Sequence, residues 1–315
     1  MISSLFTLTF LTELLSSSLR MTTPILYTAM GEVFSERAGI TNIGLEGIMV
    51  IGAVSSFISV SLTGSLFLGV LIAILCGILI NSLFAYCVIY RNSDQIVMGM
   101  ALNILAAGFA SFLYRAVFGI SQTPEKIEGF QPIHIPVLAD IPVLGEVLFH
   151  QNILLYLAFL LVPVCSFVLF RTPFGLKLRS VGEYPKAADS MGIKVYRQRF
   201  LGCIIGGAFG AVGGAYLSVA YMNMYVDNLV SGRGYIALAA VIFGKWKPKG
   251  VLLATLLFGF TDALQMRLQA MSLGIPYQFM AMLPYLVTMI ALVCFVGKSV
   301  GPAANTVNYV RGGRE

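Results

Sequence analysis

The sequence predicts an all-α integral membrane protein with about eight to ten transmembrane helices, at least one of them broken or half-length. Three observations support this fold class. Hydrophobic residues make up 58% of the 315 positions and charged residues only 11%, whereas soluble domains are about 25% charged. The hydrophobic residues recur in runs of roughly 20, the length that a helix needs to cross about 30 Å of hydrocarbon. The charged residues lie mainly between these runs.

Nine hydrophobic segments follow one another, and all but the seventh are long enough to cross a bilayer. The seventh covers only about half of the bilayer at 1.5 Å per residue, which predicts a half-helix or one arm of a broken helix. Gly232, Gly234 and Gly244 flank it, as unwound backbone at its ends requires. The first segment has no basic residue before it and no small-residue cleavage site, so it does not resemble a cleaved signal peptide. The approximate bounds of the nine are 3–30, 42–62, 65–90, 95–117, 152–170, 199–220, 234–244, 250–270 and 277–297.

The distribution of positive charge predicts the orientation. If successive linkers lie on opposite sides of the membrane, 16 of the 20 Lys and Arg residues fall on one side. The other four are Arg115, Lys126, Arg233 and Arg267. The positive-inside rule makes the richer side cytoplasmic, which puts the N-terminus outside and the C-terminus inside. The net charge of +6 is therefore a topology signal, and no nucleic-acid partner is expected. An interfacial first helix, or a split near Gly39, would change the count by one and move the N-terminus.

These segments define one domain. Residues 1–300 are expected to form a single transmembrane domain, with an extracytoplasmic loop at 118–151 and a cytoplasmic loop at 171–198. Residues 301–315 are expected to form a cytoplasmic tail.

Polar residues cluster in the stretch "GEVFSERAGITNIGLEGIM" at 31–49. Glu32, Glu36 and Arg37 are expected to lie between spans on the cytoplasmic side, solvated or paired locally. Asn42 and Glu46 lie four apart on one helical face among several glycines, which predicts a bent start to a span, facing inward. Two roles remain open for Glu46: it lines a solute pathway, or it caps backbone amides at a subunit contact.

Other polar residues lie inside the predicted spans. Membrane helices place such groups toward a cavity or another helix. Asp262, Gln265 and Gln269 share one helical face, and an interhelical hydrogen bond explains each polar group nearly as well as contact with a solute. Gly206, Gly210 and Gly214 repeat every four residues and predict close helix packing. The full set of predicted pathway residues is Asn42, Glu46, Asn81, Asn103, Asp262 and Gln265.

Sequence signals of catalysis are absent. "VGKS" at 296–299 has Leu292 where a phosphate-binding loop requires glycine, so no nucleotide site is expected in this chain. His134 and His150 have no partners at ligand spacing, and the five cysteines lie within hydrophobic runs. No enzyme activity, cofactor or metal is predicted.

The cytoplasmic loop contains a predicted short helix. Pro185 suits the first helical position and Gly192 suits a left-handed stop. An isolated helix this short is not stable in water, so either the rest of the chain or a partner must hold it.

Three segments of the sequence resemble one family. "GEYPKAADSMGI" resembles the cytoplasmic coupling segment of membrane subunits in bacterial ABC importers for nucleosides, simple sugars and branched-chain amino acids. "SERAGITNIGLEGIM" is similar to the N-terminal signature of this branch, closest to nucleoside permeases, and "GGAFGAVGGAYLS" also fits. The resemblance covers roughly residues 20–298.

The resemblance implies a multi-pass permease of the bacterial cytoplasmic membrane that forms half of a nucleoside pathway. The implied partners are a second related permease (a different chain, or an identical copy), two cytoplasmic ATPase sites and an extracytoplasmic solute-binding lipoprotein. ATP hydrolysis would take place in the ATPase and not in this chain. The residues implied to contact the ATPase are Glu183, Pro185, Lys186, Ala187, Asp189 and Gly192.

Two alternatives remain. A ribose or simple-sugar permease of the same branch would share these motifs. An ion-coupled secondary transporter would use Glu46 or Asp262 as its ion site, but it would not need the cytoplasmic helix between Pro185 and Gly192. A membrane enzyme would need a reactive cluster that the sequence lacks.

Overall fold

The computed structural model describes residues 8–119, 125–134, 144–270, 276–284, 286–287, 289–290 and 301–312. Six helices are long and apolar enough to cross a membrane. This confirms a helical, multi-span protein. The last part of the expected span at 277–297, from residue 291 onward, falls outside the described residues, together with the "VGKS" segment and Cys294. The six helices are α2 (Leu45–Thr63), α3 (Leu66–Tyr90), α4 (Gln95–Phe118), α6 (Ile153–Arg171), α9 with its continuation η2 (Val195–Tyr221) and α11 (Pro248–Ala270).

Several helices begin or end at a capping residue, close to the bounds that the sequence predicted. The Asp94 carboxylate accepts the amides of Ile96 and Val97, both at 2.9 Å, at the start of α4. Asn152 does the same for α6. These caps satisfy amides that have no partner within the helix. Gly64 ends α2 in the left-handed conformation that glycine adopts without strain (φ +67°).

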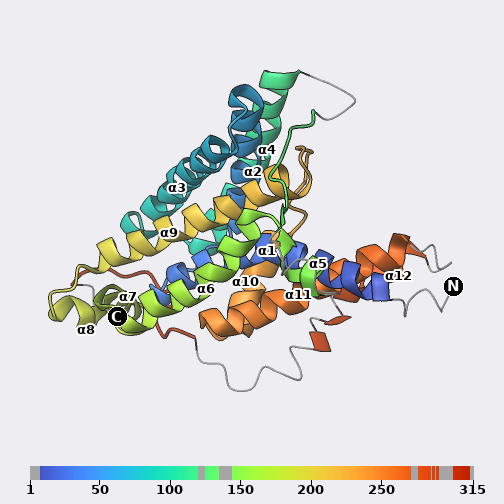
Figure 1. The fold of residues 1–315 in the computed structure, drawn as a ribbon. Helices are drawn as coiled ribbons and strands as arrows, with labels where there is room; N and C mark the ends of the chain where they lie inside the picture. Colours follow the sequence, from blue (N-terminus) through green and yellow to red (C-terminus); the bar gives the residue numbers. More distant parts are fainter. Residues whose placement is uncertain are drawn as a thin grey trace.

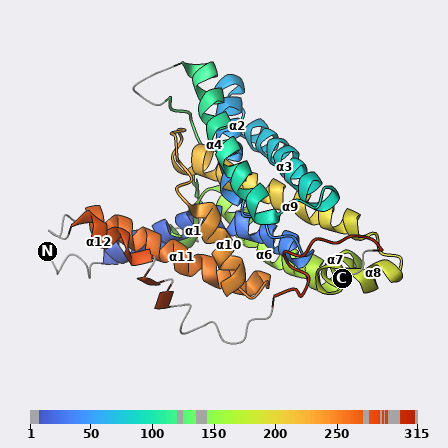
Figure 2. The ribbon, with the colours of Figure 1, turned by 180° about the vertical axis from the view of Figure 1, so that it is seen from behind.

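Helix α1 (Leu8–Arg37) runs through the middle of the molecule and is 30 residues long. It contacts α6, α9, α10 and α11. The predicted glycine ridge of α9 packs against it and against α2: a Cβ on Gly31 would lie 3.0 Å from the Gly206 carbonyl oxygen, and a Cβ on Gly210 would lie 3.0 Å from the Ile48 side chain. Figures 1 and 2 show α2, α3 and α4 leaning together away from α1, α6 and α11, with α9 between the two groups.

One end of the bundle, called the α8 end below, carries α7 (Pro173–Glu183), α8 (Pro185–Ser190) and residues 301–312 (Figure 1). The sequence analysis predicted α8 but missed α7, which Thr172 caps and Pro173 opens. At the opposite end, β1 (Ile133–His134) pairs with β2 (His150–Gln151), with α5 (Leu144–Leu148) before β2 and α12 (Tyr277–Ala281) after α11.

The short segment expected at 234–244 is helix α10 (Arg233–Phe243), 11 residues long. Gly232 precedes it with a positive φ of 83°, a conformation that suits glycine. The end of α9 that leads toward it changes to a π-helix, η2 (Leu217–Tyr221). The connection between η2 and α10 contains three non-glycine residues in the left-handed region: Asn223, Asn228 and Ser231.

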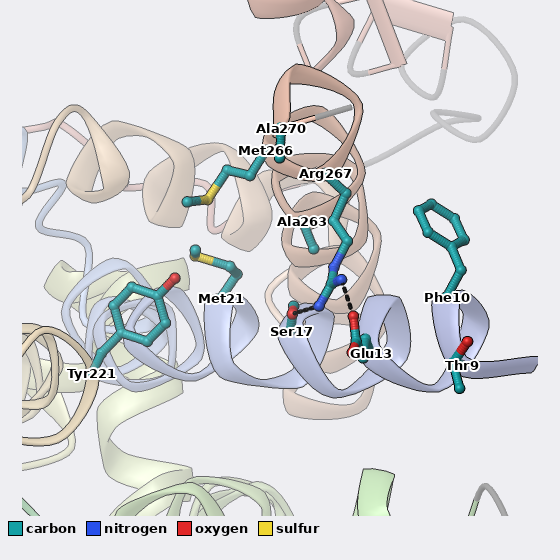
Figure 3. A pocket seen from close by; sticks show the side chains of 10 residues that line it. All are labelled: Thr9, Phe10, Glu13, Ser17, Met21, Tyr221, Ala263, Met266, Arg267 and Ala270. Atoms are coloured by element: carbon teal, nitrogen blue, oxygen red, sulfur yellow. Dashed lines mark hydrogen bonds and ion pairs between the residues drawn. The ribbon is translucent and has the colours of Figure 1, made fainter. Parts of the chain in front are cut away.

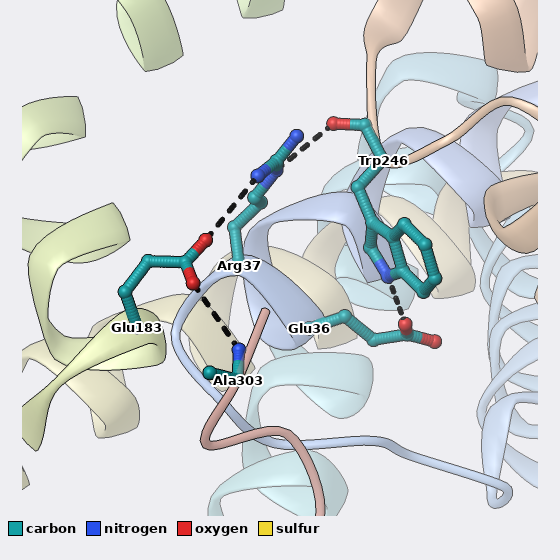
Figure 4. A network of polar contacts seen from close by, with 5 residues as sticks. All are labelled: Glu36, Arg37, Glu183, Trp246 and Ala303. Atoms are coloured by element: carbon teal, nitrogen blue, oxygen red, sulfur yellow. Dashed lines mark hydrogen bonds and ion pairs between the residues drawn. The ribbon is translucent and has the colours of Figure 1, made fainter. Parts of the chain in front are cut away.

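The expectation that Glu32, Glu36 and Arg37 lie between spans was wrong. All three belong to α1, and both carboxylates are buried. Trp246 Nε1 donates to Glu36 Oε2, and Arg37 Nε donates to the Trp246 carbonyl at 3.0 Å (Figure 4). Asn305 Nδ2 also donates to Glu36 Oε2. These partners come from more than 200 residues away, so the local sequence could not reveal them.

Candidate transport site

The site begins at the break between α1 and α2. Residues 38–44 connect the two helices, and Gly44, the residue before α2, provides no side-chain cap. Amides in the first turn of a helix need partners from elsewhere when the local chain supplies none. Four of the predicted pathway residues meet here: Asn42, Glu46, Asn81 and Asn103. We call these four residues the junction cluster.

Asn42 and Asn81 are fully buried and link three helices. Asn42 Nδ2 donates to Asn81 Oδ1 at 2.8 Å, and Asn81 Nδ2 donates to the Cys203 carbonyl on α9. The backbone amide of Asn42 donates to Glu32 Oε1 on α1 at 2.8 Å. The side-chain oxygen of Asn42 also accepts the Gly44 amide at 2.8 Å. These bonds fix the path of the break between α1 and α2.

Asn103 on α4 holds the other side of the break. Gly47 N donates to Asn103 Oδ1 at 2.7 Å, and Asn103 Nδ2 donates to the Ile43 carbonyl at 3.0 Å. Asn103 Nδ2 also donates to the hydroxyl of Tyr235 at 2.9 Å. Tyr235 lies in the first turn of α10 and is 47% exposed. Sequence reasoning missed Tyr235, although its position at the start of the short helix was a signal.

Glu46 joins the starts of α2 and α10. Its Oε1 accepts the amide of Gly232 at 2.7 Å, and its Oε2 accepts the amide of Gly234 at 2.8 Å. Neither residue brings a side chain that could cap α10, and a carboxylate is favoured at a helix N-terminus by the helix dipole. A Cβ on Gly234 would lie 2.6 Å from Glu46 Cα, so only glycine fits. The contact that the structure shows for Glu46 is therefore backbone capping, within one chain. A role in the solute pathway stays a prediction.

Asp262 and Gln265 lie apart from the junction cluster. Both are half-buried on α11, and within the described residues no hydrogen bond joins either of them to the cluster. Asp262 interacts electrostatically with Arg233, at the start of α10. Arg233, at the start of α10, is thus one link between the two predicted groups of pathway residues.

A cavity of about 510 Å³ lies between the first half of α1, η2 and the last half of α11 (Figure 3). Arg267 pairs with Glu13 across it and donates to Ser17 Oγ at 3.3 Å. A second cavity of about 360 Å³ shares three of its wall residues and reaches Asp227, Asn228 and Arg233. The shared walls are Met21, Tyr221 and Met266.

Helix α8 lies at the surface where the sequence placed it. Tyr184 before it and Met191 after it are 71% and 82% exposed, and Ala187 is also exposed. Ala188 is buried against Val181 and Val195 and belongs to one apolar cluster with Tyr309. Gly192 follows with a φ of +81°. The chain itself therefore provides the support that so short a helix needs.

Two other residues implied to contact the ATPase pair with the rest of the chain: Glu183 at the end of α7 and Asp189 in α8. Glu183 accepts the amide of Ala303 at 3.2 Å and lies 4.0 Å from Arg37 (Figure 4). Asp189 forms an ion pair with Arg311 at 3.1 Å. Burial, together with the neighbouring Asp189, raises the pKa of Tyr309. Lys186 lines a groove beside α8 that is described below.

No group of three or more His, Cys, Asp or Glu side chains that could hold a metal occurs in the described part of the chain. The four cysteines described there, Cys76, Cys87, Cys165 and Cys203, are free thiols.

Residues 14–295 match the model of a family described as the permease component of branched-chain amino acid transport systems. The chain is 42% identical to the guanosine ABC transporter permease protein NupQ of Bacillus subtilis, over 92% of this chain and 94% of NupQ. The same identity and coverage hold for the nucleoside ABC transporter permease protein NupC of Lactococcus lactis. A putative glucose ABC transporter permease protein of Haloferax volcanii, TsgC13, is 38% identical over 85% of this chain and 81% of its own length.

A more distant relative is the guanosine ABC transporter permease protein NupP, also of Bacillus subtilis. It is 22% identical over 77% of this chain and 70% of NupP. No solved structure matches the chain.

Proposed function

Because the chain belongs to the ABC-transporter permease family of branched-chain amino acid transport systems, we propose that it is the membrane permease of an ATP-driven nucleoside importer. Family members are membrane transport components and not enzymes. The observation that carries the nucleoside assignment is the 42% identity to NupQ and NupC, which extends over 92% of the chain. Matches of this length include both the junction cluster and α8.

We place the solute pathway along the surface where α2, α4 and α10 meet. Tyr235 is 47% exposed and its hydroxyl accepts from Asn103 Nδ2, so these two residues are the proposed contacts for the solute. Asn42, Asn81 and Glu46 are proposed to hold the helix starts that frame it. Asp262 and Gln265 are proposed to extend the pathway along α11. The cavity walled by Met21, Tyr221 and Met266 suits an uncharged solute, because its Arg267 and Glu13 neutralise each other.

The proposed topology has the domain bounds and the helix count that the sequence analysis predicted. Residues 1–300 form one transmembrane domain of about eight to ten helices, in which α10 is the half-helix. The α8 end faces the cytoplasm of a bacterial cell, together with the tail at 301–315. The positive charge of the segment from Arg171 to Arg199 supports this orientation.

Coupling to the ATPase is proposed to occur through α8. Its exposed residues form a small protrusion that a cytoplasmic subunit can grip, and Gly192 ends it sharply. The proposed contacts are Glu183, Pro185, Lys186, Ala187, Asp189 and Gly192.

The second permease is proposed to be a different, related chain. This is supported by Bacillus subtilis having two guanosine permease proteins, NupQ and NupP, that both match this sequence. A solute-binding lipoprotein outside and two ATPase sites inside complete the assembly.

The test is reconstitution of the complete complex in proteoliposomes, with ATP turnover measured against guanosine, adenosine, uridine, ribose, glucose and leucine. We expect stimulation by nucleosides. Stimulation by glucose or ribose alone would favour a sugar permease, the alternative that TsgC13 supports. Nucleoside uptake driven by an ion gradient without ATP would contradict the importer and favour the secondary transporter.

A further inference from the structure

The groove beside α8 has two walls, one where α7 ends and α8 begins and one formed by the C-terminal segment. The cavity measures about 630 Å³. The first wall is formed by Glu183, Tyr184, Pro185, Lys186 and Ala187. The second wall belongs to the C-terminal segment 301–312, called the tail segment below: Ala303, Ala304, Val307, Asn308, Tyr309 and Val310.

Both walls expose apolar side chains. Val307 and Val310 on the tail segment are 54% and 51% exposed, and Tyr184 on the other wall is 71% exposed. On the proposed cytoplasmic side such groups face water and not lipid. Exposed apolar patches in contact with water mark surfaces that bind proteins. The rim of this groove is basic on balance. Lys186 lies in the groove wall, and Lys194 and Arg197 are exposed at the start of α9, which α8 contacts. The acidic residues Glu183 and Asp189 are paired with Arg37 and Arg311.

The tail segment is bound firmly enough to act as a fixed wall. Arg199, itself buried, donates to the Val307 carbonyl at 2.8 Å. The Ala304 amide donates to the Gly182 carbonyl at 2.9 Å. Arg311 pairs with Asp189 of α8. The two walls are therefore joined to each other at both ends of the groove.

The tail segment also reaches the elements that carry the junction cluster. Thr41 Oγ1 donates to Asn305 Oδ1 at 3.0 Å, and Asn305 Nδ2 donates to Glu36 Oε2 at 3.3 Å. Asn308 Nδ2 donates to the Asn92 carbonyl, in the turn before α4, at 2.9 Å. A force applied at the groove would thus act on α1, on the break between α1 and α2, and on the start of α4.

We propose that α8 and the tail segment form one composite docking surface for the cytoplasmic ATPase, which inserts an apolar element flanked by acidic residues between the two walls. The acidic flanks follow from the basic rim, and the apolar element follows from Tyr184, Val307 and Val310. This inference rests on the proposed function and adds to it a second contact region, more than 100 residues from α8 in the sequence.

The test measures the affinity of the purified two-permease complex for its ATPase subunit by biolayer interferometry. Val307→Asp and Val310→Asp place a negative charge in the groove, and we expect about tenfold weaker binding for each. Thr306→Asp is the matched control. Thr306 is exposed on the same segment but does not line the groove, and its φ of +62° is one that Asp adopts more readily than Thr. We expect its affinity to stay within twofold of the wild type.

A photocrosslinking amino acid placed at position 310 or 306 tests contact without relying on a loss of binding. Crosslinking to the ATPase from 310 and not from 306 supports the composite surface. Crosslinking from 310 to the second permease, or wild-type affinity in both groove variants, overturns it while leaving the proposed function intact. If the wild-type complex binds no ATPase, the proposed function itself fails. Each variant is first checked for a monodisperse size-exclusion profile. If an aspartate variant fails this check, its affinity is disregarded and the crosslinking result tests the composite surface.

Discussion

At the scale of single residues, Glu46 shows how a charged group can be stable inside a membrane protein. A charge at the centre of a bilayer costs about 2.5–3.5 kcal/mol on insertion scales. Glu46 offsets this cost by accepting two backbone amides of another helix. Its carboxylate replaces the side-chain cap that Gly232 cannot supply. The residue therefore holds α2 and α10 together at their starts.

Replacing Glu46 by Gln tests this role. The variant keeps the side-chain shape, but it loses the charge and one of the two acceptor oxygens. We expect the free energy of unfolding to fall by about 2 kcal/mol, since hydrogen bonds to charged groups contribute about 1.5–3 kcal/mol. Unfolding by SDS in mixed micelles measures this change. Glu125→Gln is the control, because Glu125 is exposed. Equal stability of both variants would show that Glu46 has no structural role.

The space at Gly234 gives a second residue-scale prediction. A methyl group there would lie 2.6 Å from Glu46 Cα, so Gly234→Ala must push α10 away from α2. We expect lower stability and little or no nucleoside-stimulated ATP turnover. Gly108→Ala is the control, because a Cβ on Gly108 of α4 meets no atom within 4 Å. Alanine favours a helix over glycine by up to about 1 kcal/mol, so a stable, active Gly234→Ala protein would contradict the close contact.

The same scale shows where sequence reasoning stops. Asn42, Glu46, Asn81 and Asn103 could be selected because polar groups are costly among apolar ones. Their mutual contacts could not be predicted, since Asn81 and Asn103 lie 39 and 56 residues from their partners. Glu36 was misplaced for a similar reason: its partner Trp246 is 210 residues away. Tyr235 was missed because aromatic residues are common throughout this chain.

At the scale of helices, most boundaries could be predicted to within a few residues. Hydrophobic runs set the lengths, and capping residues such as Asp94 and Asn152 set the starts. Helix α7 was missed because the basic residues of 171–198 were interpreted as a topology signal and only the segment after Pro185 as a helix. Its Pro173 opens the helix at the same position that Pro185 takes in α8, where the sequence analysis did use this signal.

Gly192 gives a prediction at this scale. Its φ of +81° lies in the left-handed region, which costs a side-chain-bearing residue about 1–2 kcal/mol. A Cβ at Gly192 meets no atom within 4 Å, so Gly192→Val strains the end of α8 without a clash. We expect normal membrane insertion but at least a several-fold loss of nucleoside-stimulated ATP turnover.

Gly64→Val provides the matched comparison. Gly64 has a similar φ of +67° and equally open surroundings, but it ends α2. We expect it to retain turnover. If both variants lose turnover equally, the effect comes from general strain and not from coupling at α8.

At the scale of the whole molecule, the polar surface near Asn103 and Tyr235 is incomplete. Neither Asn103 nor Tyr235 lines any of the three cavities described above, so the described part of this chain does not enclose this surface. A route for a polar solute across a bilayer needs polar or aqueous surroundings on all sides. Under the proposed function, we expect a second permease to supply the remainder.

The complex lacking the second permease tests this requirement. This chain, expressed with its ATPase and binding protein alone, is expected to show no nucleoside-stimulated ATP turnover. Turnover should return when the related permease is co-expressed. Full turnover by this chain alone, eluting as a dimer, would instead establish a homodimer.

The acidic residues of α1 have a further consequence. Glu32 and Glu36 lie one helical turn apart on the same face. One accepts the Asn42 amide and the other accepts Trp246 and Asn305. A rotation of α1 about its own axis would loosen both sets of bonds at once. If ATPase binding at the α8 end rotated α1, the same rotation would release the backbone before α2, and no intervening chain of side-chain contacts would be needed.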